Sequence, residues 1–411
     1  MKLHPFQERG RDFLAGRKVA LLADEMRLGK TPQAIAAARK VGARSVVVVC
    51  PAIAQAHWRQ AWRDWWPGGP APAVYSYNYL TLHLTKVKRV LGDIDVLMVD
   101  ESHYCKSADA QRTKAVFGKR GLAHQAGRVW ALTGTPCPNH VGELWPLLRT
   151  AGIVGSYGSF IRHYCWFTET GDIGGTRKDR VATLKRVVAP LMLRRTRARV
   201  APELPKAEVY PWHVEAKLSA EALELDAAVQ RDLDRLSPAE AAEYLEQHAG
   251  HLAQLRIWVA TAKVPTVAAT LVEELEAGAG PFVVFGYHRA PLEALKRALE
   301  FRGRSTRLVH GGVPHSARQE ALQAFTARKA DVFIGQLHAA GTAIDLSVAC
   351  DGVLLERDWV PGVNAQALER MGGWKQTRPV TVREAIVPDT IDEVVARVVD
   401  RKQSEIEELM T

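Results

Sequence analysis

The chain has 411 residues, of which 47% are hydrophobic and 24% are charged. This composition is ordinary for a globular protein and excludes a disordered chain, a fibrous repeat and a small disulfide-stapled scaffold. At about 100–200 residues per domain, the length predicts two or three domains. The net charge of +10 is uneven, because residues 1–200 carry +18 and residues 201–411 carry −8. The basic first half indicates contact with a polyanion, and a merely solubilising surface is the alternative.

The cysteines and the N-terminus favour a cytoplasmic protein. The five cysteines show neither metal-ligand nor C-x-x-C spacing and are typical of reduced thiols. The N-terminus, MKLHPFQ, has no apolar signal core, and the apolar run Val46–Cys50 is too short to span a bilayer. The histidines lack paired zinc spacing. We therefore expect no structural metal and no membrane association.

In the first half, short apolar runs alternate with helical patterns, which predicts a parallel sheet covered by helices. The expected strands are Val19–Ala23, Ser45–Cys50, Ile94–Val99 and Val129–Leu132. The segment Gln55–Trp66 is expected to be a helix whose tryptophans face the core, since Trp58, Trp62 and Trp65 recur at helical spacing.

The middle of the chain is acidic, and the pattern resumes after it. Pro202–Pro211 is expected to be a linker, and helices are expected from Lys217 to Ala277 with breaks near Ser237-Pro238 and Val264-Pro265. Residues 201–280 carry −8, whereas residues 281–411 are neutral. The second pattern predicts strands Phe282–Phe285, Arg307–Val309, Val332–Ile334, Val353–Glu356 and Val380–Val387, and helices Pro291–Phe301, Ser316–Phe325 and Thr390–Met410.

The expected strand Val19–Ala23 leads into Asp24-Glu25-Met26-Arg27-Leu28-Gly29-Lys30-Thr31 and then a helix that has Pro32 in its first turn. A strand, a tight loop, Gly-Lys-Thr and a helix N-terminus are typical of a phosphate-binding loop. Backbone N–H groups and the helix dipole face the anion, Lys30 reaches the β and γ phosphates, and the Thr31 hydroxyl binds Mg²⁺.

The expected strand Ile94–Val99 ends in Asp100-Glu101-Ser102-His103. Carboxylates at the tip of a strand beside a phosphate-binding loop suit metal binding and activation of water. Asp100 would serve the Mg²⁺ ion, and Glu101 would orient and deprotonate the attacking water. Together the two motifs predict a nucleotide-hydrolysing site.

With these motifs the sequence resembles the Snf-type ATPases of helicase superfamily two, which are the motors of chromatin remodellers and related DNA translocases. It is similar in particular to the small HARP-like annealing-helicase branch and its phage and bacterial relatives. The resemblance covers almost the whole chain, and the matching motifs occur in family order: Leu3–Gln7, Asp24–Thr31, Val49–Pro51 with Trp58, Ser76-Tyr77, Asp100–His103, Leu132–Pro136 with Asn139 and Glu143–Trp145, Leu193–Thr196, Phe282–His288, His310–Gly312 with Arg318, Ala339–Gly341 through Asp345-Leu346, and Glu356, Trp359, Pro361 and Gln366 leading to Arg370.

The resemblance implies roles for individual residues. The catalytic residues would be Lys30, Asp100, Glu101 and Arg370. The ATP-binding residues would be His4, Gln7 as the adenine reader, Asp24, Glu25, Met26, Arg27, Leu28, Gly29, Lys30, Thr31, Gly341, Asp345, Gln366 and Arg370, with Thr31 and Asp100 on Mg²⁺. Coupling would fall to His103, Thr133, Gly134 and Thr135. The DNA contacts would be Pro51, Trp58, Tyr77, Asn139, Arg194, Arg195, His288, His310, Gly311 and Arg318.

Two positions depart from the family pattern. Arg27 stands where the family usually has glycine, so it must adopt an ordinary backbone angle or accept strain. Gly373 stands where a second arginine, an arginine finger, is expected after Arg370. We hypothesise that Arg27 replaces the missing charge; Lys375 is the other candidate. On this hypothesis Gly373→Arg would partly rescue Arg27→Gly.

The resemblance implies an α/β protein with two RecA-like lobes and ATP bound between them. We expect lobe 1 at residues 1–200, a linker and helical protrusion at 201–280, lobe 2 at 281–386 and a C-terminal brace helix at 387–411. The implied function is ATP-dependent translocation on double-stranded DNA by a monomer that holds mainly phosphates, with ATP and Mg²⁺ as cofactors. The alternatives are a strand-separating or fork-remodelling helicase and a decayed, non-hydrolysing DNA-binding module.

Overall fold

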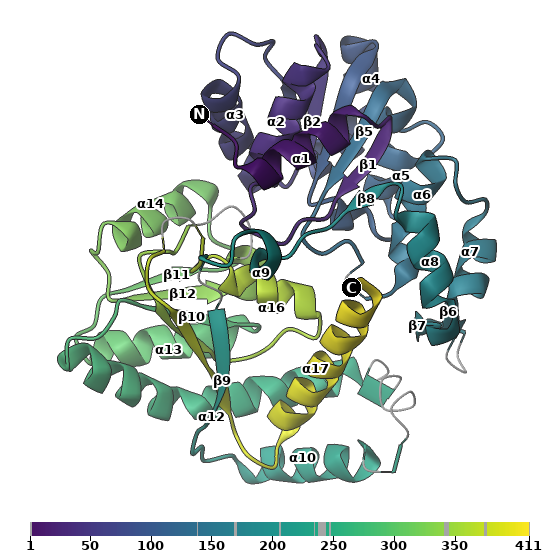
Figure 1. Cartoon of the computed structure of the whole chain (residues 1–411). Coiled ribbons are helices and arrows are strands. Elements are labelled where there is room, and N and C mark those ends of the chain that lie inside the picture. The colour runs from purple at the N-terminus through teal and green to yellow at the C-terminus, as the bar shows by residue number, and fades with distance from the viewer. Residues whose placement is uncertain are drawn as a thin grey trace. The chain divides into compact units, whose positions relative to one another are not determined.

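The computed structural model describes residues 2–137, 139–167, 171–204, 207–233, 235–236, 244–245, 248–340, 345–373 and 376–410. The chain divides into two units (Figure 1). Unit 1 spans residues 1–202 together with 406–411, and unit 2 spans residues 203–405.

Unit 1 is built around a six-stranded parallel sheet in the order β3-β2-β4-β5-β1-β8. Its strands are β1 (Val19–Leu22), β2 (Val46–Cys50), β3 (Ala73–Ser76), β4 (Ile94–Asp100), β5 (Ala126–Leu132) and β8 (Met192–Leu193). A separate antiparallel hairpin pairs β6 (Cys165–Phe167) with β7 (Ile173–Thr176).

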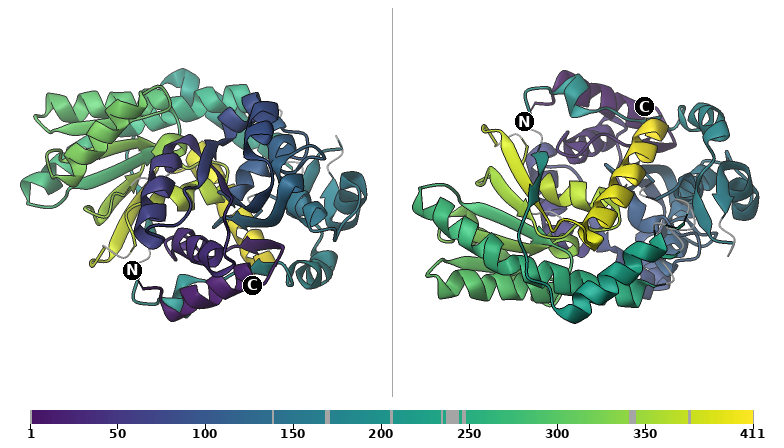
Figure 2. Two further views of the ribbon diagram at one scale, coloured as in Figure 1. Left: turned by 90° about the horizontal axis from the view of Figure 1, so that it is seen from above. Right: turned by 90° about the horizontal axis from the view of Figure 1, so that it is seen from below.

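Helices connect the strands of unit 1 and cover both faces of its sheet (Figures 1 and 2). They are α1 (Pro5–Ala15), α2 (Lys30–Lys40), α3 (Gln55–Trp65), α4 (Tyr77–Leu91), α5 (Gln111–Phe117), α6 (Trp145–Thr150), α7 (Tyr157–Tyr164), α8 (Val181–Val188) and α9 (Arg197–Val200). Short 3₁₀ turns lie at Ala52–Ala54, Ser102–Cys105, Leu122–Gln125, Val141–Leu144 and Lys178–Arg180.

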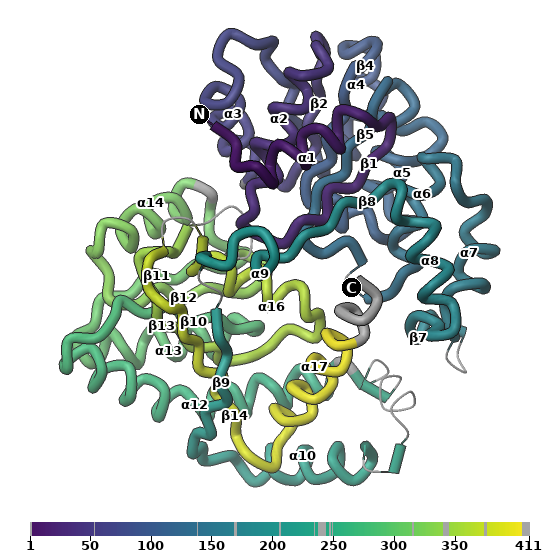
Figure 3. The backbone as a smooth tube through the Cα atoms, in the orientation of Figure 1, coloured from purple at the N-terminus to yellow at the C-terminus, as the bar shows by residue number. Residues whose placement is uncertain are grey.

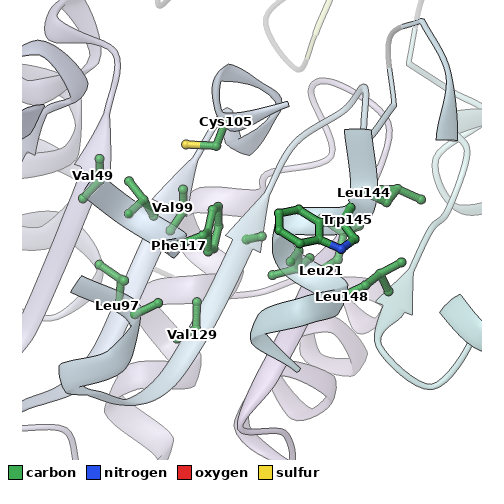
Figure 4. Close-up of a cluster of buried hydrophobic side chains, with 14 of the residues drawn as sticks. Leu21, Val49, Leu97, Val99, Cys105, Phe117, Val129, Leu144, Trp145 and Leu148 are labelled. Carbon is green, nitrogen blue, oxygen red and sulfur yellow. The ribbon is translucent and has the colours of Figure 1, made fainter. Parts of the chain in front are cut away.

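Alternate residues of each strand in unit 1 supply two hydrophobic cores, one on each face of the sheet. Leu97 and Val99 of β4 pack with Phe117 and Trp145 in one core (Figure 4). Their neighbours Val96 and Met98 pack in the other core with the fully buried Trp58. Burial on both faces explains why these strands are continuous apolar runs in the sequence.

Unit 2 contains a second six-stranded parallel sheet, in the order β11-β12-β10-β13-β14-β9. Its strands are β9 (Ala207–His213), β10 (Phe282–Gly286), β11 (Thr306–Val309), β12 (Val332–Gln336), β13 (Asp351–Leu354) and β14 (Val380–Ile386). Its helices are α10 (Ala220–Leu233), α12 (Ala249–Glu276), α13 (Arg289–Phe301), α14 (His315–Thr326), α15 (Leu337–Ala340), α16 (Pro361–Leu368) and α17 (Ile391–Met410). The two sheets confirm the predicted fold class, two RecA-like α/β lobes.

The middle segment differs from the expected linker and protrusion. Ala207–His213 forms the edge strand β9, which pairs with β14 over its whole length (Figure 3). Leu255, Val259 and Leu271 of α12 lie in the core of unit 2, and so do Ile391 and Val395 of α17. Most of the predicted insertion is therefore part of the second unit, because its apolar helix faces are buried against the second sheet.

Helix α12 also runs through the expected break at Val264-Pro265. Pro265 and Thr261 are both exposed, so water can reach the carbonyl that loses its hydrogen-bond donor at the proline. The expected break at 237–238 lies outside the described residues. By length and composition α12 could cross a membrane, but 56% of its apolar window is buried within the protein, as in a core helix.

Candidate functional site

The phosphate-binding loop predicted from the sequence follows β1, and α2 begins at Lys30. Gly29 caps the helix with a φ of +71°, and a Cβ there would lie 2.5 Å from Gln7 Nε2. A side chain at this position would be strained and would displace the buried Gln7. Arg27 has a φ of 67°. Of the two conformations open to Arg27, the structure has the strained, left-handed one.

Lys30 is held at the start of the loop. Its Nζ donates to the carbonyl of Asp24 at 2.8 Å and to that of Glu25 at 3.4 Å. The buried Gln7 donates from Nε2 to the carbonyl of Leu28 and accepts from the backbone N–H of His4. Gln7 thus fixes the loop in this structure, and its predicted contact with adenine stays a prediction.

Asp24 and Arg195 form a buried ion pair within unit 1. Asp24 is fully buried, Arg195 is 7% exposed, and Arg195 Nε donates to Asp24 Oδ1 at 2.8 Å. A second guanidinium nitrogen also pairs with the carboxylate. These contacts contradict a direct side-chain contact of Asp24 with ATP and of Arg195 with DNA, because both charged groups are already satisfied inside the unit.

Two aromatic residues predicted to contact DNA instead support the carboxylates at the end of β4. Trp58 is fully buried, and its Nε1 donates to Asp100 Oδ2 at 2.7 Å. Tyr77 is 4% exposed, and its hydroxyl donates to the carbonyl of Asp100 at 2.7 Å. The prediction of DNA contacts was wrong for both, because each side chain points inward from α3 or α4 onto β4.

The paired carboxylates Asp100 and Glu101 suit a hard divalent cation. Burial, reinforced by the neighbouring charge of Glu101, raises the pKa of Asp100 well above its usual range. A bound cation would offset the repulsion, and carboxylate and hydroxyl oxygens are ligands that Mg²⁺ accepts. Glu101 itself has a φ of 48°, which is uncommon for a residue other than glycine.

The predicted coupling residues come together beside these carboxylates. His103 Nδ1 lies 2.9 Å from Thr133 Oγ1, 3.3 Å from Thr135 Oγ1 and 3.4 Å from Glu101 Oε2. Burial lowers the pKa of His103, which favours the neutral ring. Gly134 borders the phosphate loop, since a Cβ on it would lie 2.8 Å from Met26 Cγ. The loop and this cluster are therefore in close contact.

Sequence reasoning missed two buried polar residues at this site, Gln33 and Arg197. Gln33 is fully buried on α2 between the apolar core residues of that helix. Arg197 is 3% exposed, and its backbone N–H donates to Glu25 Oε2 at 2.6 Å. A polar residue on the apolar face of α2 was the available signal for Gln33, whereas Arg197 was hidden in a basic run.

Among the predicted nucleotide residues of unit 2, Gln366 lies in α16 and Arg370 follows that helix. The carbonyl of Arg370 accepts from the backbone N–H of Leu346 at 2.8 Å, which brings the Asp345 segment beside Arg370. Gln366 is 7% exposed. Gly341 and Lys375 lie outside the described residues. Gly373 has a φ of 108°, which no side chain adopts easily, so the rescue by Gly373→Arg is no longer expected.

Some of the remaining residues predicted to contact DNA are buried, and others are accessible to solvent. Pro51 and His310 are buried, and His310 accepts from the backbone N–H of Gly312, so neither side chain is available for a direct contact. His288 is held by Glu356 at 2.7 Å. Asn139 and Gly311 are exposed, and Arg194 and Arg318 are half-buried, so they remain candidates.

Comparison with known proteins shows what the chain is similar to. The protein-family model described as SNF2-related domain matches residues 71–224. The chain resembles Snf-type ATPases. It is 27% identical to the SWI/SNF-related matrix-associated actin-dependent regulator of chromatin subfamily A-like protein 1 of Xenopus tropicalis, with 97% of this chain and 44% of that protein covered. It is also 27% identical to the DNA annealing helicase and endonuclease ZRANB3 of Mus musculus, with 98% and 40% covered.

The chain thus spans less than half the length of these two relatives. Among solved structures it resembles the Sulfolobus solfataricus SWI2/SNF2 ATPase core in complex with double-stranded DNA, with 21% identity and a TM-score of 0.45. That match covers 100% of this chain and 93% of the other.

Proposed function

We propose that the chain is a DNA-stimulated ATPase of the Snf type that uses ATP hydrolysis to translocate on double-stranded DNA. One observation carries the proposal: within unit 1, the phosphate loop, the carboxylate pair and the His103 cluster form one connected site. The matches to the SNF2-related domain and to chromatin-regulator and annealing-helicase relatives support it.

The residues of unit 1 have separate roles in this reaction. Lys30 exchanges its carbonyl contacts for the β and γ phosphates of ATP. Asp100 and Thr31 hold Mg²⁺, which when bound neutralises charge on those phosphates. Glu101 accepts a proton from the attacking water. Duplex DNA binds mainly through its phosphates, which suits the charge of +18 on residues 1–200.

The test is steady-state ATP hydrolysis without DNA and with single strands, duplex or forks. We expect duplex to stimulate turnover and DNA affinity to fall with salt, with a log–log slope of about −0.9 per phosphate contact. Glu101→Gln should bind ATP and DNA but lose about 10²-fold or more in rate, and Lys30→Ala should also lose nucleotide affinity. Equal turnover with and without DNA at low salt would refute the proposal.

A second candidate, fork remodelling or strand annealing, is favoured by the relatives named as annealing helicases. A preference for forks over duplex in the same ATPase assay, together with ATP-dependent annealing of separated strands, would select it. Translocation on plain duplex without strand annealing would select the first proposal.

A further inference from the structure

The carboxamide of Gln33 joins the two halves of the phosphate loop. Its Nε2 lies 3.1 Å from each of three acceptors: Asp24 Oδ2 in the first half, and the carbonyls of Leu28 and Gly29 in the second. Its Oε1 accepts from Arg195 at 2.8 Å. A Cβ on Gly10 would lie 1.7 Å from this oxygen, so glycine in α1 leaves the space that Gln33 occupies.

The first half of the loop is also tied to the segment that follows β8. The backbone N–H of Ala23 donates to Leu193 at 2.8 Å, and that of Glu25 donates to Arg195 at 2.9 Å. Arg197 continues the ladder through its bond to the Glu25 carboxylate. Arg195 also donates to the carbonyl of Phe6 in α1. Residues 193–197 are therefore bonded to the loop, and unit 1 ends only five residues later, at Pro202.

Lys30 rests on the carbonyls of Asp24 and Glu25, the same two residues that this segment holds. A bound phosphate would compete with those carbonyls for the N–H donors of Lys30. Occupancy of the loop by a nucleotide therefore changes the hydrogen bonding of the residues to which 193–197 is attached. Gln33 links this change to the second half of the loop.

We propose that Gln33 is a positioning residue that couples nucleotide binding at the phosphate loop to the connecting segment 193–197. The inference rests on the proposed function, because it requires that nucleotide binds at this loop. The coupling runs through the neutral carboxamide and the buried Asp24–Arg195 pair, so it needs no change of net charge. It gives the chain a route by which an occupied loop alters the start of the connection to unit 2.

The experiment combines MgADP binding with amide hydrogen exchange followed by mass spectrometry. In the parent protein, saturating MgADP should slow exchange in peptides covering residues 191–200. Gln33→Met keeps a similar volume and the ion pair but removes the hydrogen bonds. It should raise the Kd for MgADP about tenfold and remove more than half of the protection at 191–200. Gln60→Met, at an exposed glutamine of α3, is the matched control and should change neither quantity.

The outcomes separate the two levels of inference. A parent protein that does not bind MgADP refutes the proposed function and removes the basis of the coupling. A parent that binds MgADP but shows unchanged exchange at 191–200 refutes the coupling alone, without any variant. A folded Gln33→Met variant with parental Kd and parental protection also refutes the role of Gln33.

Discussion

The left-handed backbone at Arg27 predicts which of two replacements, glycine or alanine, is the more stable. Arg27 has a φ of 67°, so a side chain with a Cβ is strained there. Arg27→Ala and Arg27→Gly both remove the guanidinium, and their difference isolates the backbone. The left-handed conformation costs a Cβ-bearing residue about 1–2 kcal/mol and the extra freedom of glycine costs about 0.5–1 kcal/mol. At the midpoints of these ranges, Arg27→Gly should be the more stable by about 0.75 kcal/mol.

For a unit of about 200 residues this difference corresponds to roughly 1–4 °C in Tm. The assay is thermal and urea unfolding of both variants. Arg328, exposed and with a φ of 57°, is a matched control in which glycine should again be the more stable replacement. At Gln60, inside α3, the order should reverse by about 1 kcal/mol. If Arg27→Ala were as stable as Arg27→Gly, the strain argument would be refuted.

The same variants test whether Arg27 supplies the charge that Gly373 lacks. Because an arginine finger is worth roughly 10³–10⁵ in rate, both Arg27 variants should lower DNA-stimulated hydrolysis by about 10³-fold. The Arg328 variants should keep the parental rate. Parental turnover in either Arg27 variant would show that the strained arginine is not part of the catalytic charge.

Two further predictions follow from burial. Trp58→Phe loses the hydrogen bond to Asp100, so it should lower the free energy of unfolding by about 1–3 kcal/mol in urea titrations. Duplex affinity should stay within about twofold. A tenfold loss of affinity in the folded variant would contradict a purely structural role of Trp58. All five cysteines are buried, and burial raises the pKa of Cys105 to about 12 and of Cys165 to about 11, so a thiol reagent should label the native protein slowly and the unfolded protein at five sites. Rapid labelling of native Cys165 would contradict this burial.

The strands that the sequence predicts well are those buried on both faces. Val46–Cys50 and Phe282–Phe285 are continuous apolar runs because helices cover both sides of each sheet. Strand β9 was missed because it lies at a sheet edge, where it contains Pro211 and mostly exposed side chains. An edge strand needs neither an apolar run nor every backbone donor, so composition does not reveal it.

The motifs predicted where the site lies but not what each side chain does there. The motifs alone predict where Lys30, Glu101 and His103 lie, because strand ends and helix starts meet at one edge of a parallel sheet. Trp58 and Asp100 are 42 residues apart, and Arg195 and Asp24 are 171 residues apart. Aromatic and basic side chains serve equally in DNA contacts and in buried support, and only the fold decides which partner they reach.

Because some basic side chains are buried, other basic residues must supply the positive charge that contacts DNA. Arg194 and Arg195 were predicted to contact DNA, but Arg195 and the nearby Arg197 are buried against Asp24 and Glu25. The charges of these two arginines and two acidic residues sum to zero. The net charge of +18 on residues 1–200 is therefore carried by other residues. Phosphate contacts depend on charges that solvent and counterions can reach. The basic character of the first half thus still supports duplex binding. Arg195 and Arg197 instead form ion pairs with the phosphate loop.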